Sequence, residues 1–146
     1  MAERLDLGNY LPYLINRVGF ALVESFTAEL EPHGLRIDMW RVLAALSNNG
    51  EQRQVDLVAM TSIDASTMSR LVGGLVRGGL VTRSRSAKSS REVVVELSPK
   101  GRALVQRLIP IAKRLEQTAS AGLPAKDLAV VKRALGRMHG NLAGRR

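Results

Sequence analysis

The sequence predicts a mainly helical fold with one small β-hairpin, an α+β architecture in which helices dominate. Apolar residues recur at three- and four-residue spacing over most of the chain, whereas the alternation typical of a strand is confined to residues 93–97. Glycine, proline and asparagine separate these periodic segments. The 146 residues and 45% hydrophobic content suit one folded domain that spans the whole chain.

The first periodic segment predicts a long helix from about Asn9 to Leu30. Asn9 is a suitable N-cap, and Pro12 suits a first turn because the N–H that it lacks would have no helical partner there. Pro32 and Gly34 then end the helical pattern. The apolar face of this helix consists of Leu11, Leu14, Ile15, Val18, Leu22 and Phe26.

A helix-turn-helix is predicted in the middle of the chain. A second helix through IDMWRVLAAL ends in the turn-prone residues 48–50, and a short third helix spans about residues 54–60. Asp64 is a good N-cap for the next helix, which extends to Arg77. The apolar stripe of that helix is Met68, Leu71, Val72, Leu75 and Val76. Its opposite face carries Ser66, Thr67, Ser69 and Arg70.

A β-hairpin follows this helix directly. Residues 80–83 supply one strand, and residues 93–97 supply the other, with Val93, Val95 and Leu97 on one side and Val94 and Glu96 on the other. Residues 84–90 are too polar and too rich in serine to pack, so we expect them to project as a loop, the wing. The basic residues of this region are Arg77, Arg83, Arg85, Lys88 and Arg91, with no acid before Glu92.

The C-terminal third predicts two more helices. Ser98 and Pro99 form a cap and first turn, Gly122 ends the helix they begin, and Pro124 starts the last one. The last helix repeats apolar residues at alternating three- and four-residue spacing: Leu128, Val131, Leu135, Met138 and Leu142. This seam could pack within the chain or against a second copy. We expect a homodimer, because both terminal helices have apolar faces that a small winged domain cannot cover.

The charge of the chain indicates a polyanionic partner. The formal net charge is +9, and neutralisation of phosphates supplies much of the affinity of proteins for nucleic acids. A membrane surface is the rival partner, yet no apolar run approaches the roughly 20 residues that a spanning helix needs. The first residues also lack the layout of a signal peptide, so we expect a soluble cytoplasmic protein that associates with DNA and not with membranes.

Enzymatic chemistry finds little support in the composition. The absence of cysteine excludes disulfides, thiolate zinc sites and thiol nucleophiles. The two histidines, His33 and His139, are far apart in the sequence, and neither a phosphate-binding Gly-Lys loop nor a metal-ligand cluster is present. We therefore expect no catalytic residues, cofactor or metal.

Three stretches, GLRIDMWRVLAAL, STMSRLVGGLVRGGLV and REVVVELSPKG, resemble the MarR family of bacterial winged helix-turn-helix transcriptional regulators. The resemblance covers nearly the whole chain. It implies a DNA-binding region at about 36–98 and dimerisation helices at about 9–32 and 99–146. It also implies a homodimer, usually a repressor, that binds a pseudo-palindromic operator and is often released by a small molecule. The expected dimer contacts are Leu11, Leu14, Val18, Leu128, Val131, Leu135 and Met138.

Two positions depart from the family pattern. The family usually has an acid two positions before the wing arginine, where this chain has Ser89 ahead of Arg91, so we expect Ser90 or the backbone to support Arg91. The recognition helix contains Gly73 and Gly74 where the family commonly has an acid and a base, and each glycine costs up to about 1 kcal/mol of helix stability relative to alanine. The glycines either permit a closer approach of backbone and phosphate or reflect drift at an exposed position.

The predicted DNA contacts fall into three groups. Hydroxyls and a guanidinium on the recognition helix can reach base edges and phosphates, although a serine-rich helix start is often mere capping: Ser66, Thr67, Ser69 and Arg70. A second group either positions the protein electrostatically or forms a merely solvated face: Arg77, Arg83, Arg85 and Lys88. Arg91 of the wing is expected to contact the minor groove or a phosphate.

A pocket for a small-molecule effector is the least specific expectation. The aromatic residues gather before Arg41, in the first two helices. In this interpretation Tyr13 and Trp40 stack on an aromatic acid or acyl thioester whose charge is held by Arg17 or Arg41, although a role in the core is the favoured one for Trp40 alone. The candidate residues are Tyr10, Tyr13, Asn16, Arg17, Trp40 and Arg41, with Phe20 and His33 nearby in sequence.

An alternative function is that of an architectural winged-helix protein that binds nucleic acid or a partner protein without an effector and with little sequence preference. The polar face of the recognition helix argues against it, because hydroxyls and a guanidinium at the start of a helix suit the reading of base edges.

Overall fold

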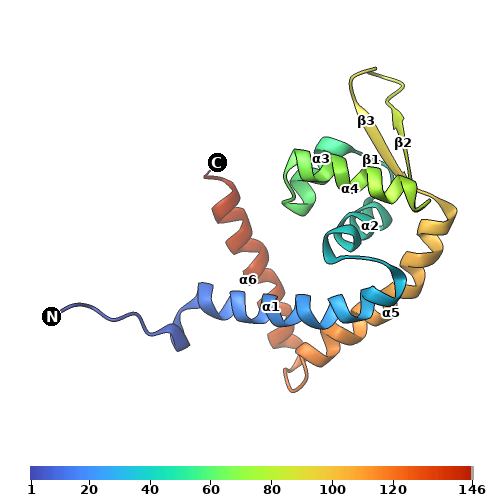
Figure 1. The fold of residues 1–146 in the computed structure, drawn as a ribbon. Helices are drawn as coiled ribbons and strands as arrows, with labels where there is room; N and C mark the ends of the chain where they lie inside the picture. The colour runs from blue at the N-terminus through green and yellow to red at the C-terminus, as the bar shows by residue number, and fades with distance from the viewer. Residues whose placement is uncertain (146) are drawn as a thin grey trace. The chain divides into compact units, whose positions relative to one another are not determined.

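A computed structural model of the protein describes residues 1–145 and confirms the predicted helical fold with a small antiparallel sheet (Figure 1). The chain divides into two compact units, Met1–Ala112 and the segment from Lys113 onward. The helices are α1 (Leu11–Leu30), α2 (Ile37–Asn49), α3 (Gln54–Thr61), α4 (Ala65–Arg77), α5 (Pro99–Ala119) and α6 (Ala125–Ala143). The strands are β1 (Gln52–Arg53), β2 (Val81–Arg85) and β3 (Val93–Leu97).

The start of α1 differs from the sequence prediction. Asn9 does not cap the helix, because it belongs to a preceding 3-10 turn, Leu7–Asn9, in which the Asp6 carboxylate accepts the N–H of Gly8. The chain leaves this turn with extended backbone at Tyr10, which is therefore the N-cap of α1. Pro12 lies in the first turn, as predicted.

The break between α1 and α2 is confirmed. After a second 3-10 turn, Glu31–His33, the chain passes through Gly34 with φ +69°. This left-handed conformation favours glycine because a Cβ would meet the backbone. The break turns the chain into α2, whose C-terminal residue, Asn49, is followed by Gly50.

The core of the first unit is formed by α2, α3 and α4 together with the end of α1, the hairpin and the first half of α5. The residues buried on α2, α3 and α4 are Val42, Leu43, Leu46, Leu57, Met68, Leu71, Val72 and Leu75. The prediction that Val76 belongs to the buried stripe is wrong, since this side chain is 36% exposed. Val76 lies at the edge of the stripe, because each step along a helix rotates the side chain by about 100°. The α4 stripe thus narrows in its last turn.

The sheet has the strand order β1-β3-β2, and both pairings are antiparallel. The hairpin register joins Val81 to Leu97 and Arg85 to Val93, so the first strand runs from 81 to 85 rather than from 80 to 83 as predicted. The wing loop consequently spans 86–92. Strand β1 is not predictable from the sequence, because two residues are too few to show alternation.

The junction of the hairpin with α5 is tied by one serine. The Ser98 hydroxyl donates to the Gly79 carbonyl at 2.6 Å and accepts the Gly101 N–H at 3.0 Å. Pro99 then starts α5 as predicted. The serine thus joins the turn after α4 to the first turn of α5.

The second unit contains the end of α5 and all of α6. Gly122, with φ +85°, lies between them, and an ion pair joins Lys132 to Glu116. No residue of α6 is buried, and its apolar seam is exposed or half-buried. In the first unit, the N-terminal part of α1 likewise exposes Leu11, Leu14, Ile15 and Val18. Within residues 1–145, each unit therefore exposes apolar side chains along one helix.

No helix within residues 1–145 combines the length and apolar character that crossing a bilayer requires.

Candidate nucleic-acid interface

The recognition helix α4 packs its apolar stripe inward and turns its polar face outward. Met68, Leu71, Val72 and Leu75 are buried, whereas Ser66, Ser69 and Arg70 are exposed and Thr67 is half-buried. Beside α4 the β2–β3 hairpin extends away from the helices (Figure 1). The Arg83 guanidinium reaches the Ser69 carbonyl at 3.5 Å, which links β2 to the polar face of α4. The two predicted DNA-contacting elements therefore lie next to each other.

The first turn of α4 is fixed by Asp64. Its carboxylate accepts the Thr67 N–H at 2.8 Å, the Thr67 hydroxyl at 2.7 Å and the Ser66 hydroxyl at 2.8 Å. These hydrogen bonds stabilise the ionised form and lower the pKa of Asp64 to about 2. Both hydroxyl protons are thus committed to capping, and Ser66 and Thr67 retain only oxygen lone pairs for another partner.

The wing loop is organised by local hydrogen bonds. The Arg85 guanidinium donates to the Ser90 carbonyl at 2.8 Å, and the Ser86 N–H donates to the Glu92 carbonyl at 2.9 Å. The N–H of Lys88 donates to the Ser86 hydroxyl at 3.2 Å. Arg85, the last residue of β2, thus stabilises the wing loop that follows it.

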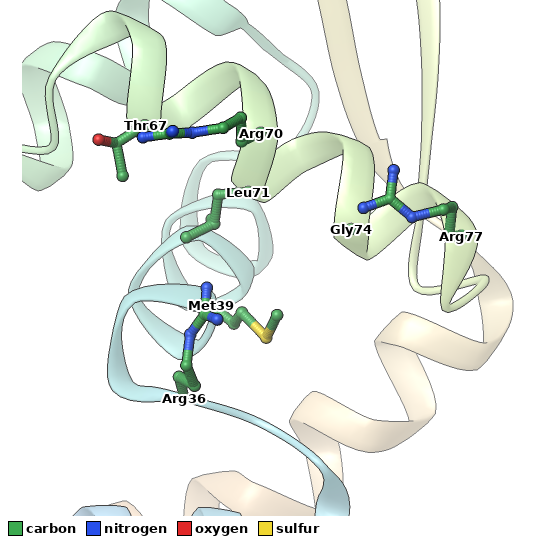
Figure 2. Close-up of a pocket in the computed structure, with 7 residues that line it drawn as sticks. All are labelled: Arg36, Met39, Thr67, Arg70, Leu71, Gly74 and Arg77. Carbon is green, nitrogen blue, oxygen red and sulfur yellow. The ribbon is translucent and has the colours of Figure 1, made fainter.

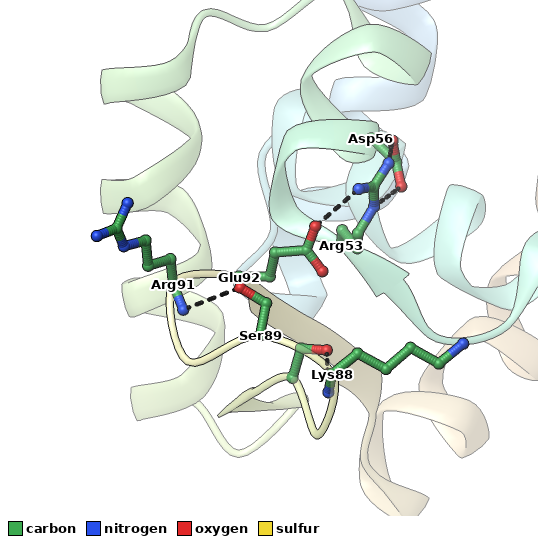
Figure 3. A network of polar contacts seen from close by, with 7 residues as sticks. Arg53, Asp56, Lys88, Ser89, Arg91 and Glu92 are labelled. Carbon is green, nitrogen blue, oxygen red and sulfur yellow. Dashed lines mark hydrogen bonds and ion pairs between the residues drawn. The ribbon is translucent and has the colours of Figure 1, made fainter.

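In the wing loop, Arg91 is held through its backbone. Its N–H donates to the Ser89 hydroxyl at 3.4 Å, while the Ser90 carbonyl is taken by Arg85. Ser89, at the place of the family's acid, thus contacts only the backbone of Arg91 in this loop. Figure 3 shows the Arg91 guanidinium pointing away from the other labelled charged groups. Support of the Arg91 side chain by Ser90 or by the backbone stays a prediction.

A charged cluster at the base of the wing was missed by the sequence analysis. Arg53 of β1 forms hydrogen-bonded ion pairs with Asp56 at 2.8 Å and with Glu92 at 2.9 Å (Figure 3). The two carboxylates raise the pKa of Arg53 above its ordinary value, and the Arg53 hydrogen bond lowers the pKa of Asp56. The Arg53–Asp56 spacing is visible in the sequence, but the contact with Glu92 requires the β1–β3 pairing.

One flank of α4, between its buried stripe and its exposed face, borders a hollow of about 370 Å³ that is also lined by residues at the start of α2. Figure 2 shows the residues that line it: Arg36, Met39, Thr67, Arg70, Leu71, Gly74 and Arg77. Arg70 and Arg77 are among the predicted DNA contacts, whereas Arg36 is not. Nothing in the sequence places Arg36 opposite α4, since the approach of the two helices is a tertiary contact.

Two aromatic contacts involve the predicted effector residues. The half-buried Trp40 packs edge-to-face on the buried Phe26, with ring centroids 5.3 Å apart. Tyr13 instead lies below the guanidinium of Arg17, 5.8 Å from the ring centroid. Tyr10, Asn16, Arg17 and Arg41 are exposed.

Comparison with known proteins places these features in a family. A sequence profile described as the MarR family matches residues 33–92. An HTH-type transcriptional repressor of Mycobacterium tuberculosis is 30% identical over 125 residues, which cover 86% of this chain and 90% of that protein.

Solved structures agree. Bordetella bronchiseptica BpsR, whose DNA binding is regulated by 6-hydroxynicotinic acid, superposes with a TM-score of 0.80 at 29% identity, covering 88% of this chain and 98% of BpsR. A MarR family transcriptional regulator from Silicibacter pomeroyi superposes with a TM-score of 0.86 at 29% identity, covering 95% and 96% of the two chains.

Proposed function

Because this chain belongs to the MarR family of transcriptional regulators, which are not enzymes, we propose that it is a repressor that binds a pseudo-palindromic DNA operator as a homodimer. The observation that carries the proposal is the polar face of α4, which lies next to a basic wing and exposes Arg70. A helix of this kind fits the major groove, where base edges present distinct patterns of donors and acceptors.

The roles of the contact residues follow from where they lie. Arg70 and Ser69, exposed on α4, read base edges or phosphates, and the capping pair Ser66 and Thr67 adds acceptor oxygens. Arg91, in the wing loop shortly before β3, reaches the adjoining minor groove. The remaining basic residues contact phosphates and set the position of the protein on the duplex: Arg77, Arg83, Arg85 and Lys88.

The homodimer rests on the exposed apolar faces of α1 and α6. In a monomer, two apolar faces would remain in water. One contains Leu11, Leu14 and Val18, and the other contains Val131 and Leu135. Leu128 and Met138 complete the α6 seam. A two-fold dimer of such chains matches the symmetry of a palindromic site, and the dimer interface sets the spacing of the half-sites.

A small aromatic acid is the proposed effector. The support is the likeness to BpsR, whose DNA binding responds to such an acid. Binding of the acid would favour a dimer whose recognition helices no longer match the half-site spacing, because a ligand shifts an equilibrium toward the state that it binds better.

The operator is identified by selecting bound fragments from the source genome, with and without a panel of aromatic acids and acyl thioesters. A repressor enriches a palindromic sequence and prefers it over random DNA by about 10³-fold or more at physiological salt. Failure to enrich any sequence would favour an architectural protein with little sequence preference.

A matched pair of variants tests the assignment of the major-groove helix. Arg70→Ala should weaken operator binding by about 1–3 kcal/mol and leave the dimer intact. Arg102→Ala, which removes an exposed arginine of α5, is the control for loss of charge. Wild-type affinity of the Arg70→Ala variant would show that α4 does not enter the groove as proposed.

A further inference from the structure

The hollow between α2 and α4 is lined by the kinds of residue that bind an anion. Its floor is apolar, with the Met39 and Leu71 side chains and the backbone of Gly74, and three arginines stand around it (Figure 2). Arg36 comes from the start of α2, whereas Arg70 and Arg77 come from the same face of α4, seven residues apart. No acidic side chain lines the hollow.

The positive charge around the hollow is largely uncompensated. Within residues 1–145, neither Arg70 nor Arg77 forms an ion pair. Arg36 shares only its Nε with Asp38, at 3.3 Å, and its side chain is 68% exposed, so its terminal nitrogens remain available. A guanidinium presents a planar set of donors that matches the oxygens of a phosphate.

The two glycines of α4 determine where Arg77 lies. A Cβ on Gly73 would be 3.4 Å from Nη1 of Arg77, and a Cβ on Gly74 would be 3.7 Å from Nη2. The Arg77 side chain therefore folds back along the helix, toward Arg70, over a strip that has no side chains. The methyl group of an alanine at position 73 or 74 would only touch the Arg77 guanidinium, but a longer side chain would occupy the space of the guanidinium. A carboxylate at position 73 would form an ion pair with Arg77.

We propose that this hollow is a phosphate-binding site occupied by a phosphate of the DNA backbone. Arg36 contacts this phosphate from outside the helix-turn-helix. Gly73 is a positioning residue that leaves Arg77 unpaired. The inference rests on the proposed function, since the DNA strand beside the major groove reaches the hollow only if α4 enters that groove. A free phosphate has the same chemistry, and the experiments below separate the two sources.

The first test removes the charge of Arg36. Binding of the full-length protein to a random-sequence duplex is measured over a series of salt concentrations, for the wild type, for Arg36→Gln and for the control Arg102→Gln. Each lost phosphate contact lowers the slope of log Kobs against log salt by about 0.9 in magnitude. Arg36→Gln should show this loss and Arg102→Gln should not. Equal slopes in the two variants would overturn the role of Arg36.

The second test restores an acid beside Arg77. Gly73→Glu and Gly73→Gln add side chains of the same length to the same helical position, and they differ only in charge. The slope of log Kobs against log salt should be smaller in magnitude by about 0.9 for Gly73→Glu than for Gly73→Gln, because the glutamate carboxylate pairs with Arg77 and one phosphate contact is lost. Identical slopes would show that Arg77 does not bind phosphate from this position.

The third test separates DNA from a free anion. Inorganic phosphate is titrated against chloride at matched ionic strength while the amide resonances of Gly73 and Gly74 are followed by NMR. Weak, unsaturated shifts, together with the slope losses above, support a backbone phosphate. Saturable binding that Arg36→Gln abolishes, with unchanged slopes on DNA, would assign the hollow to a free phosphate instead. A wild type that binds no duplex at all would contradict the proposed function itself.

Discussion

Arg53 and Glu92 are 39 residues apart in the chain, yet Nη1 of Arg53 donates to Oε1 of Glu92 at 2.9 Å. Arg53 belongs to β1 and also holds Asp56 in the first turn of α3, so the pair joins the end of the wing loop to the helix-turn-helix. The wing loop of this protein is thus supported by an arginine outside the hairpin, in a chain that has Ser89 where its family usually has an acid.

Loss of this pair should loosen the wing without unfolding the domain. Arg53→Gln is expected to speed amide hydrogen exchange in residues 86–92 and to weaken operator binding, whereas the melting temperature changes little because exposed ion pairs contribute little to global stability. Glu92→Gln should loosen the wing loop in the same way, and the double variant should be no worse than Arg53→Gln alone, which also removes the pair with Asp56. Additive effects would mean that the two residues act independently.

Asp64 should give α4 a dependence on acid pH. Its pKa is lowered from 3.8 to about 2 in the folded protein, so the stabilisation is complete above about pH 4 and is lost as the pH falls through about 2. Urea unfolding of the wild type and of Asp64→Asn is compared across this interval. Asparagine caps a helix without titrating, so the variant should lack this part of the pH dependence. Parallel pH profiles would contradict the assignment.

Gly101 should not tolerate a side chain. A Cβ at this buried position would be 2.0 Å from the Leu80 carbonyl oxygen, so α5 would have to move away from the turn that follows α4. We expect Gly101→Ala to destabilise the protein by about 1–3 kcal/mol or more in denaturant unfolding. Gly140→Ala is the control: a Cβ there meets nothing within 4 Å, and the variant should gain up to about 1 kcal/mol.

The α6 seam offers a test of the dimer with two neighbouring valines. Val131 lies on the seam and is 44% exposed, whereas Val130 lies beside it and is 53% exposed. Val131→Asp should convert the dimer to a monomer in sedimentation velocity, because a carboxylate in an apolar interface is costly to desolvate. Val130→Asp should remain dimeric. Dimers of equal stability in both variants would place the interface elsewhere.

Arg91 should contribute to DNA binding through its side chain alone. Its N–H is held by Ser89 and its guanidinium points away from the Arg53 cluster, so Arg91→Ala should leave the loop intact. The expected loss of operator affinity is about 1–3 kcal/mol, measured by fluorescence anisotropy. Unchanged affinity would remove Arg91 from the interface.

Features that depend on residues close together in the chain were predictable. The Asp64 cap, the apolar stripe of α4 and the alternation in β3 each involve residues within a few positions of one another, and the structure confirms all three. The errors at Asn9 and Val76 are also local in origin. A preceding turn displaced the cap, and the edge of a helical stripe is not sharply defined by spacing.

The candidate site was predictable only in part. The exposed face of α4 and the basic wing were visible in the sequence, because the residues that form them are contiguous. Arg36 and Arg53 were missed, since each becomes part of the site through a partner on another element: α4 for Arg36 and Glu92 for Arg53.

The sequence by itself determined the order of helices and hairpin, the polar face of α4 and the excess of positive charge, because spacing and composition decide these directly. Only the tertiary structure decided that Arg53 reaches Glu92, that Arg36 lines the same hollow as Arg77 and that Gly101 lies against Leu80. Each of these contacts joins separate elements, and their approach depends on how the whole core packs rather than on any local pattern.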